Sequence, residues 1–370
     1  MKIVLMISAL SRGGAEQQLI RLASGLVESG IQVQVWCYGG PSSEDQVLEE
    51  SGVVVRVADS RGQLAKLARV RAWLDDFKPD VVHAFMKRAS SLALMARLGK
   101  SVPVVIGSDM STATYNRSEP ALWIALVLFA LADAVVTQTA LNQRSLHLLA
   151  PWLRRKTRVV RNGLDLSRFK PKARTTSSEI FRFVSVGSVY SVKNPLRLIA
   201  ALIILRERGR TNLRVDWYGR LGLSGDETPS DDYRRCVRLI AAEGLGAMIH
   251  FHGERTDIHY AYSDADAIIH PSVQEGFPNA VIEGMACGLP IVVGQVSDLP
   301  LVVETANNGF VFNETDPDSI ADAMEAMMKI SLDVRHEMGQ RSRDLVEQWF
   351  SKERFVDEFR ALYSELLYKQ

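Results

Sequence analysis

Two glutamates eight positions apart give the sequence its clearest chemical signal. Glu275 opens the segment Glu-Gly-Phe-Pro-Asn-Ala-Val-Ile-Glu, which ends at Glu283, and it directly follows a predicted buried strand, DAIIHPS. Open α/β sheets bind ligands at the carboxyl ends of their strands, so Glu275 should lie where a ligand binds. Carboxylates at such a position accept hydrogen bonds from hydroxyl groups, such as those of a sugar or a ribose.

The residues after Glu275 predict the start of a short helix. Gly276 lets the backbone approach a ligand closely, and Pro278 and Asn279 suit the first positions of a helix. Gly288 then ends the helix, and Pro290 prevents it from resuming. N–H groups at a helix start bind anions such as a diphosphate. A lone pair of glutamates at this spacing is usually a helix cap and a surface residue, but the defined start and stop favour a binding site.

The elements that must position these residues alternate between strand and helix. In the first half, KIVLMI, IQVQVW, VVVRVA, DVVHAF, PVVIGS and DAVVTQT read as strands, with helices predicted over 15–29 and 64–77. In the second half the strands are FRFVSVG, LRVDWYG, MIHFHG, DAIIHPS and LPIVVG, with helices over 195–208, around 233–243, over 317–328 and over 335–367, with a break near 350–351. Runs of Val and Ile separated by helices indicate parallel, doubly wound sheets of the α/β class.

A polar stretch divides the two series. RVVRNGLDLSRFKPKARTTSSE is rich in turn-forming residues, as an interdomain linker should be. The sequence therefore predicts an N-terminal Rossmann-like domain over 1–165, a second one over 166–350, and a last helix over 351–370 that packs back on the first domain.

The Glu275–Glu283 segment resembles the E-x7-E signature of the family 4 retaining glycosyltransferases. The similarity covers nearly the whole chain and includes the segments Ser11-Arg-Gly-Gly-Ala-Glu16, Asn162-Gly163-x-Asp165-x3-Phe169, Gly187-x5-Lys193-Asn194 and Phe251-His-Gly253. The resemblance implies a GT-B fold, with two Rossmann-like domains facing a central cleft. It further implies that the C-terminal domain binds most of a nucleotide-sugar donor of the UDP or GDP type and that the N-terminal domain binds the acceptor.

The resemblance also assigns roles. Lys193 and the helix amides stabilise the departing diphosphate, Glu275 holds the donor hydroxyls and Glu283 binds the ribose, without a metal ion or other cofactor. Arg255 lines the base or phosphate pocket unless it is a plain surface residue. The predicted donor-binding set is Gly14, Ser188, Lys193, Arg255, Glu275, Gly276, Phe277, Pro278, Asn279 and Glu283.

Three residues differ from the family pattern or admit a second interpretation. Ser188 stands where the family usually has an arginine, and Asp109 stands in a loop that often carries a histidine. Asp109 is predicted as a catalytic and acceptor-side residue that hydrogen-bonds the sugar, or else as a turn residue or N-cap. His83, at the end of the strand DVVHAF, is predicted to contact the acceptor, or else to be a core histidine.

Other classes of protein explain the sequence less well. A nicotinamide dehydrogenase needs GxGxxG, but the first loop reads Gly-Gly-Ala-Glu, and the second strand lacks a terminal acidic residue. Asp264-Ala-Asp266 spells a metal-binding DxD but runs from a helix end into a buried strand, so no metal site is predicted. A catalytically degenerate transferase that serves as a partner protein stays open because of Ser188 and Asp109.

Charge and cysteine usage bear on location and partners. Residues 1–165 carry 20 Lys and Arg against 14 Asp and Glu, whereas the rest carry 24 against 29. A basic half suggests an anionic surface or a phosphorylated or lipid-linked glycan acceptor, and nothing resembles a nucleic-acid module. The apolar segment 121–132 is too short to span a bilayer, so it is a buried helix or one that dips into the membrane. Three scattered cysteines without a CxxC pair fit a reducing compartment, so we expect a cytoplasmic protein. We further expect it to attach peripherally to the membrane through segment 121–132 and the run Arg154-Arg-Lys-Thr-Arg158 beside Trp152.

Overall fold

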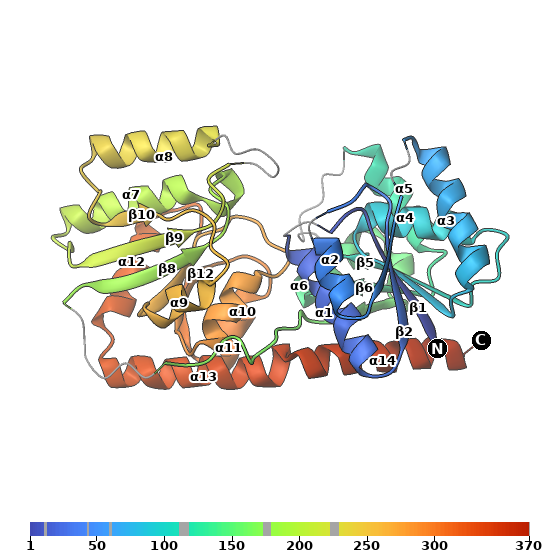
Figure 1. The fold of residues 1–370 in the computed structure, drawn as a ribbon. Helices are drawn as coiled ribbons and strands as arrows, with labels where there is room; N and C mark the ends of the chain where they lie inside the picture. Colours follow the sequence, from blue (N-terminus) through green and yellow to red (C-terminus); the bar gives the residue numbers. More distant parts are fainter. Residues whose placement is uncertain are drawn as a thin grey trace. The chain divides into compact units, whose positions relative to one another are not determined.

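The chain folds into two compact units in the computed structural model (Figure 1). The structure describes residues 1–10, 13–42, 44–58, 61–110, 118–172, 179–222 and 229–369, with only the backbone of Val47. One unit comprises Met1–Leu164 and Phe350–Gln370, and the other comprises Asp165–Trp349. We call them the N-terminal and C-terminal units.

The N-terminal unit is built on a seven-stranded parallel sheet in the order β3-β2-β1-β4-β5-β6-β7. Its strands are β1 (Lys2–Ile7), β2 (Gln32–Cys37), β3 (Val54–Val57), β4 (Val81–Ala84), β5 (Val104–Asp109), β6 (Ala134–Thr137) and β7 (Thr157–Val159). Its helices are α1 (Gly14–Glu28), α2 (Glu44–Glu50), α3 (Gln63–Phe77), α4 (Lys87–Arg97), α5 (Pro120–Phe129), α6 (Ala140–Leu149), the 3-10 turn η1 (Pro151–Leu153) and α14 (Lys352–Tyr368).

Side chains that alternate along β1 fill a core on each face of this sheet. Ile3 and Leu5 pack with α1 and α14, whereas Val4 and Met6 pack with α3, α4 and α5. A strand with both faces buried reads as a continuous apolar run, which explains KIVLMI.

The C-terminal unit has a six-stranded parallel sheet in the order β10-β9-β8-β11-β12-β13. Its strands are β8 (Phe181–Val186), β9 (Leu213–Tyr218), β10 (Ile249–Phe251), β11 (Ala267–His270), β12 (Ile291–Gly294) and β13 (Gly309–Phe312). Its helices are η2 (Ser191–Lys193), α7 (Pro195–Glu207), α8 (Asp231–Ala242), α9 (Ile258–Ser263), α10 (Asn279–Ala286), α11 (Leu299–Ala306), α12 (Pro317–Lys329) and α13 (Leu332–Phe350).

Each sheet reverses its strand order once, between β1 and β4 in one unit and between β8 and β11 in the other. At such a reversal the connections leave in opposite directions, and open α/β sheets bind ligands there, outside the carboxyl ends of the strands. Two parallel doubly wound sheets confirm the predicted α/β, Rossmann-like class.

The last helix completes the N-terminal unit. Ser351 caps α14 by accepting a hydrogen bond from the Arg354 backbone N–H, which accounts for the predicted break near 350–351. α14 lies against α1 so closely that a Cβ added at Gly25 would come within 2.4 Å of Val356. Only glycine permits this approach.

The Asn-Gly pair before Asp165 is held by the first helix. Gln18 accepts a hydrogen bond from the Gly163 N–H at 2.7 Å and donates to the Gly163 carbonyl at 3.1 Å. Arg21 donates to the same carbonyl, and a Cβ at Gly163 would lie 2.7 Å from the Phe355 side chain. The motif is therefore a structural anchor within the N-terminal unit.

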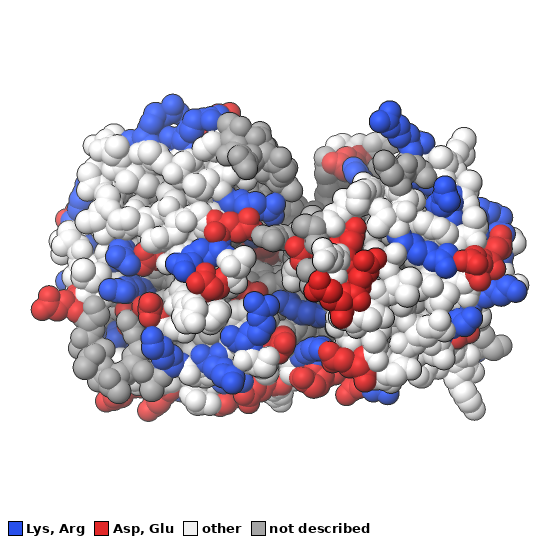
Figure 2. Space-filling view, in the orientation of Figure 1, with Lys and Arg blue, Asp and Glu red and all other residues white. Residues whose placement is uncertain are grey.

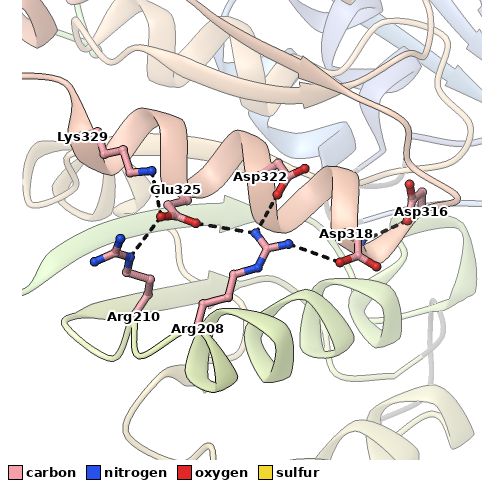
Figure 3. A network of polar contacts seen from close by, with 7 residues as sticks. All are labelled: Arg208, Arg210, Asp316, Asp318, Asp322, Glu325 and Lys329. Atoms are coloured by element: carbon pink, nitrogen blue, oxygen red, sulfur yellow. Dashed lines mark hydrogen bonds and ion pairs between the residues drawn. The ribbon is translucent and has the colours of Figure 1, made fainter.

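Charged side chains tie the surface helices of the C-terminal unit together. Figure 3 shows Arg208 and Arg210, just after the end of α7, reaching carboxylates of α12, with Arg208 2.6 Å from Asp322 and Arg210 3.0 Å from Glu325. The same network includes Asp316, Asp318 and Lys329. In Figure 2 a group of basic side chains lies over α8, whose Arg234, Arg235 and Arg238 are exposed.

Candidate functional site

The Glu275 carboxylate meets two nitrogen donors beyond the carboxyl end of β11. Its Oε1 atom lies 2.5 Å from the Lys193 Nζ and 3.0 Å from the His270 Nε2. Only 11% of the Glu275 side chain is exposed. The structure thus brings together two residues that were predicted as a site although 82 positions separate them.

The electrostatics of this cluster favour the ionised carboxylate. Burial alone would raise the pKa of Glu275, but the Lys193 ammonium and the His270 hydrogen bond lower that pKa to about 2. Burial lowers the pKa of His270, against the opposing effect of Glu275. At neutral pH the cluster therefore holds a carboxylate and a neutral imidazole.

A tight turn presents Lys193. η2 ends at Asn194, which adopts a left-handed φ of 61° and donates hydrogen bonds to the carbonyls of Pro271 and Glu314. A Cβ at Gly187 would lie 3.3 Å from the Lys193 Cδ, so the lysine side chain passes directly over this glycine. The predicted phosphate loop, Gly187 to Asn194, is thereby fixed against the segment after β11.

The helix that follows Glu275 begins where it was predicted to begin. Pro278 is the N-cap of α10 and Asn279 its first residue, while Phe277 is buried. A Cβ at Gly284 would lie 2.3 Å from Ile268, so α10 lies tightly across β11. The Gly276 carbonyl accepts a hydrogen bond from Ser297.

Glu283 lies one turn into α10 and is held by a tyrosine. The Tyr262 hydroxyl donates to the Glu283 Oε2 at 3.1 Å and to the Ala280 carbonyl at 3.0 Å. Burial, together with the Glu283 charge, raises the pKa of Tyr262 well above its usual value, so the hydroxyl keeps its proton. The second glutamate is therefore oriented by a partner that the sequence analysis did not identify.

Ser188 and Arg255 follow the neighbouring strand ends. Ser188 is half-buried and comes directly after Gly187, whose carbonyl accepts a hydrogen bond from the Trp217 indole N–H at 2.7 Å. Arg255 is exposed and forms a two-point ion pair with Asp257, at 2.7 and 2.8 Å. Its guanidinium thus already has a carboxylate partner.

In the N-terminal unit, His83 lies in the core. It is fully buried, its Nδ1 lies 2.8 Å from the Tyr363 hydroxyl, and its Nε2 lies 2.6 Å from the Ser108 hydroxyl. Burial lowers the pKa of His83 to about 3, so the ring is neutral. These contacts favour the core-histidine alternative over an acceptor contact.

Asp109 and Gly14 were the other predictions for this unit. Asp109 ends β5 with a fully buried side chain that forms an ion pair with Lys87 at 3.1 Å. Gly14 is exposed and is the first residue of α1, but Ser11 and Arg12 of the same loop lie outside the described residues. The N-cap of α1 is Gly13, which has no side chain of its own to cap the helix.

The two aspartates of the DxD sequence serve the local structure. Asp264 forms an exposed ion pair with Lys172 at 3.4 Å, and Asp266 accepts a hydrogen bond from the Arg182 backbone N–H at 2.9 Å. Among the residues that the structure describes, no three His, Cys, Asp or Glu side chains are grouped so that they could hold a metal ion.

His270 is, with Tyr262, a residue of this site that the sequence analysis missed. It is the last residue of β11, in the position that the strand-end rule assigns to ligand contacts. Its contact with Glu275, five positions on, depends on the turn between them, which the spacing alone does not define.

Comparison with known proteins agrees with this arrangement. Residues 12–168 match the family described as Glycosyltransferase Family 4, and residues 168–345 match Glycosyl transferases group 1. A D-inositol 3-phosphate glycosyltransferase of Geodermatophilus obscurus is 28% identical over 95% of this chain and 84% of its own length. The enzyme of the same name from Mycobacterium tuberculosis is 26% identical over 95% and 78%.

The fold is also found in solved structures. Anabaena HepE in complex with UDP-glucose superposes with a TM-score of 0.84 at 20% identity, over 99% of this chain and 100% of that one. Two Rossmann-like units with a carboxylate and a lysine at the carboxyl edge of the second sheet thus define a glycosyltransferase of the GT-B fold. The chain belongs to glycosyltransferase family 4, whose members retain the anomeric configuration of the transferred sugar, as the sequence predicted.

Proposed function

We propose that this enzyme transfers a sugar from a UDP- or GDP-sugar to a glycan or a lipid-linked saccharide, without a metal ion. One observation carries the proposal: Glu275 and Lys193 share a partly buried ion pair of 2.5 Å at the carboxyl edge of the C-terminal sheet. A carboxylate for hydroxyls and an ammonium for phosphates are the two groups that a nucleotide sugar requires. The UDP-glucose in HepE supports the UDP form of the donor.

The donor-binding roles follow from the chemistry of each group. Glu275 accepts hydrogen bonds from the sugar hydroxyls, and Lys193 neutralises the diphosphate at the start of α10. Glu283, oriented by Tyr262, binds the ribose hydroxyls. Because Ser188 carries no charge, we assign the cationic role in the phosphate loop to Lys193.

The proposed transfer proceeds on one face of the sugar. The bond between the anomeric carbon and the diphosphate oxygen breaks, and an acceptor hydroxyl oxygen bonds to the same face of that carbon. The acceptor proton moves to a diphosphate oxygen, and the bonding electron pair leaves with the nucleotide. Lys193 stabilises the charge that grows on the departing diphosphate.

The test is a product analysis with UDP-, GDP- and ADP-sugars and a panel of acceptors that includes inositol 3-phosphate. We expect one donor to yield a product with retained configuration at an equal rate with and without EDTA, because Lys193 and helix amides replace a cation. Mass spectrometry and NMR of the product measure this. A strict manganese requirement would contradict the metal-free proposal and direct attention to Asp264 and Asp266.

The same experiment separates the second candidate. A degenerate transferase that acts as a partner protein is suggested by Ser188 and by the buried Asp109. If no donor in the panel is transferred or hydrolysed while a nucleotide still binds, the partner-protein function replaces the catalytic one.

We propose that the N-terminal unit attaches to an anionic membrane, where lipid-linked acceptors lie. Helix α5 buries Leu122, Ala125, Leu126 and Phe129 but exposes Trp123, Ile124 and Val127, the last two at 61% and 63%. Leu131 and Trp152 extend this exposed apolar surface, and the Trp152 indole donates to the Leu126 carbonyl. No described helix is long and apolar enough to cross a membrane.

Basic residues next to this surface match an anionic leaflet. Arg154 and Arg155 are exposed beside Trp152, whereas Lys156 donates to the carbonyls of Ala130 and Ala132 at the end of α5. Residues 120–132 carry no charged side chain. An apolar helix face bordered by arginines is the arrangement that interfacial attachment requires.

We expect the protein to sediment with vesicles that contain phosphatidylglycerol and not with pure phosphatidylcholine, with binding that fades as salt rises. Each arginine near the surface contributes about 1 kcal/mol, so Arg154→Gln with Arg155→Gln should weaken binding about tenfold or more. The matched control neutralises Arg235 and Arg238 on α8 of the other unit and should leave binding unchanged. If the wild-type protein ignores anionic vesicles at low salt, the acceptor is a soluble saccharide.

A further inference from the structure

His270 lies on the face of the C-terminal sheet that carries α10. Ala267 and Ile269 of the same strand belong to the core that includes α7 and α12. Because side chains alternate along a strand, Ile268 and His270 lie on the opposite face, where Ile268 meets Gly284 of α10. The imidazole is thus attached to the rigid strand, whereas Glu275 stands on the turn after it.

The hydrogen bond between the two side chains has a defined direction. The His270 side chain is 3% exposed, and its Nε2 lies 3.0 Å from the Glu275 Oε1. An ionised carboxylate can only accept, so Nε2 carries the proton and donates it. The same oxygen is also 2.5 Å from the Lys193 Nζ.

In the proposed function, Lys193 interacts with two anionic groups, the Glu275 carboxylate and the diphosphate of the nucleotide sugar. Without donor it pairs with Glu275, yet during the reaction its charge is needed at the diphosphate. When the ammonium turns to the diphosphate, Glu275 loses its strongest partner at the moment when it must hold the sugar. A hydrogen-bond donor other than Lys193 then has to keep the Glu275 carboxylate in place.

We propose that His270 is a positioning residue, whose Nε2–H holds the Glu275 carboxylate in its sugar-binding orientation while Lys193 moves its charge to the donor diphosphate. The inference rests on the proposed function of the Glu275 site. It adds that His270 acts through Glu275 and therefore affects sugar recognition and turnover but not the binding of the nucleotide.

Two substitutions test this role. His270→Gln places an amide N–H near the position of Nε2, whereas His270→Phe keeps a planar ring without a donor. We expect His270→Phe to lower kcat/KM for the nucleotide sugar about 10- to 150-fold, the range for loss of a hydrogen bond to a charged group. We expect the His270→Gln variant to keep an activity within about threefold of the wild type. A role of the ring in packing alone would not predict this result.

Binding of UDP and of UDP-glucose, measured by calorimetry, separates positioning from damage to the fold. His270→Phe should weaken UDP-glucose and leave UDP unchanged. The matched control Tyr262→Phe removes the hydrogen bond to the other carboxylate, Glu283, and should weaken both ligands equally. In a Glu275→Ala background, His270→Phe should cause little further loss of UDP-glucose affinity, because the acceptor through which His270 acts is absent.

If the wild-type enzyme is active and the His270→Phe variant is equally active, the inference about His270 is wrong while the proposed function stands. An equal loss of UDP and UDP-glucose affinity, or an undiminished effect in the Glu275→Ala background, overturns the inference about His270 as well. If the wild type neither transfers nor binds any nucleotide sugar, the proposed function fails and the inference fails with it.

Discussion

Replacing Glu275 by alanine should lower turnover at least ~100-fold, which corresponds to about 2.7 kcal/mol of transition-state stabilisation. The carboxylate is held by Lys193 and His270 in a partly buried position, so its loss removes the proposed contact to the sugar hydroxyls. It also leaves the Lys193 ammonium and the His270 Nε2–H without the carboxylate oxygen that accepts hydrogen bonds from both. Steady-state kinetics with the productive donor measures the effect, and circular dichroism checks that the fold persists.

A glutamate of the same unit provides the control for this variant. Glu304 lies exposed on α11, and Glu304→Ala should leave the kinetics unchanged. Near-normal turnover of Glu275→Ala would remove Glu275 from the donor site and, with it, the observation on which the proposed function rests.

Glu283→Ala should act on nucleotide affinity instead of on the chemical step. A charge-assisted hydrogen bond to the ribose contributes about 1.5–3 kcal/mol, so we expect the Kd for UDP to rise roughly 10- to 150-fold. The kcat at saturating donor should change much less, because the ribose contacts are the same in the ground state and in the transition state. Calorimetry with UDP and saturation kinetics separate the two quantities.

Two outcomes would contradict the Glu283 assignment. An unchanged Kd for UDP would show that Glu283 does not contact the nucleotide and only accepts the hydrogen bond from Tyr262. A large fall in kcat with an unchanged Kd would instead assign Glu283 to the reacting sugar.

Local signals in the sequence predicted several elements closely. The helix predicted over 15–29 is Gly14–Glu28, and the one predicted over 317–328 is Pro317–Lys329, whose N-cap Asp316 accepts a hydrogen bond from the Asp318 N–H. The period of the apolar residues determines the first position, and the Asp316 cap followed by Pro317 determines the second. The short helices Glu44–Glu50 and Lys87–Arg97 were not predicted. The second has no side-chain cap at its N-cap, Met86. The first begins after Ser42, whose backbone N–H donates to Asp45, a local signal that the sequence analysis passed over.

The candidate site could be predicted only in part. The strand-end rule located Glu275 and the phosphate loop located Lys193, but their ion pair depends on how β8 and β11 align side by side. The same rule placed His83 at a strand end, but its imidazole forms a hydrogen bond with Tyr363, a residue 280 positions further along the chain. A contact over that separation leaves no local trace in the sequence, so burial and exposure could not be distinguished there.

The route of the chain has a consequence for biosynthesis. The first unit draws part of its core from α14: Phe355, Phe359 and Tyr363 pack with strands formed more than 200 residues earlier, and Leu164 pairs with Ser351. A ribosome therefore releases every strand of the first sheet long before the helix that completes its core. The second unit, whose residues form one uninterrupted stretch, is able to finish folding first, and the nascent first unit stays exposed to proteases and chaperones until the final helix docks.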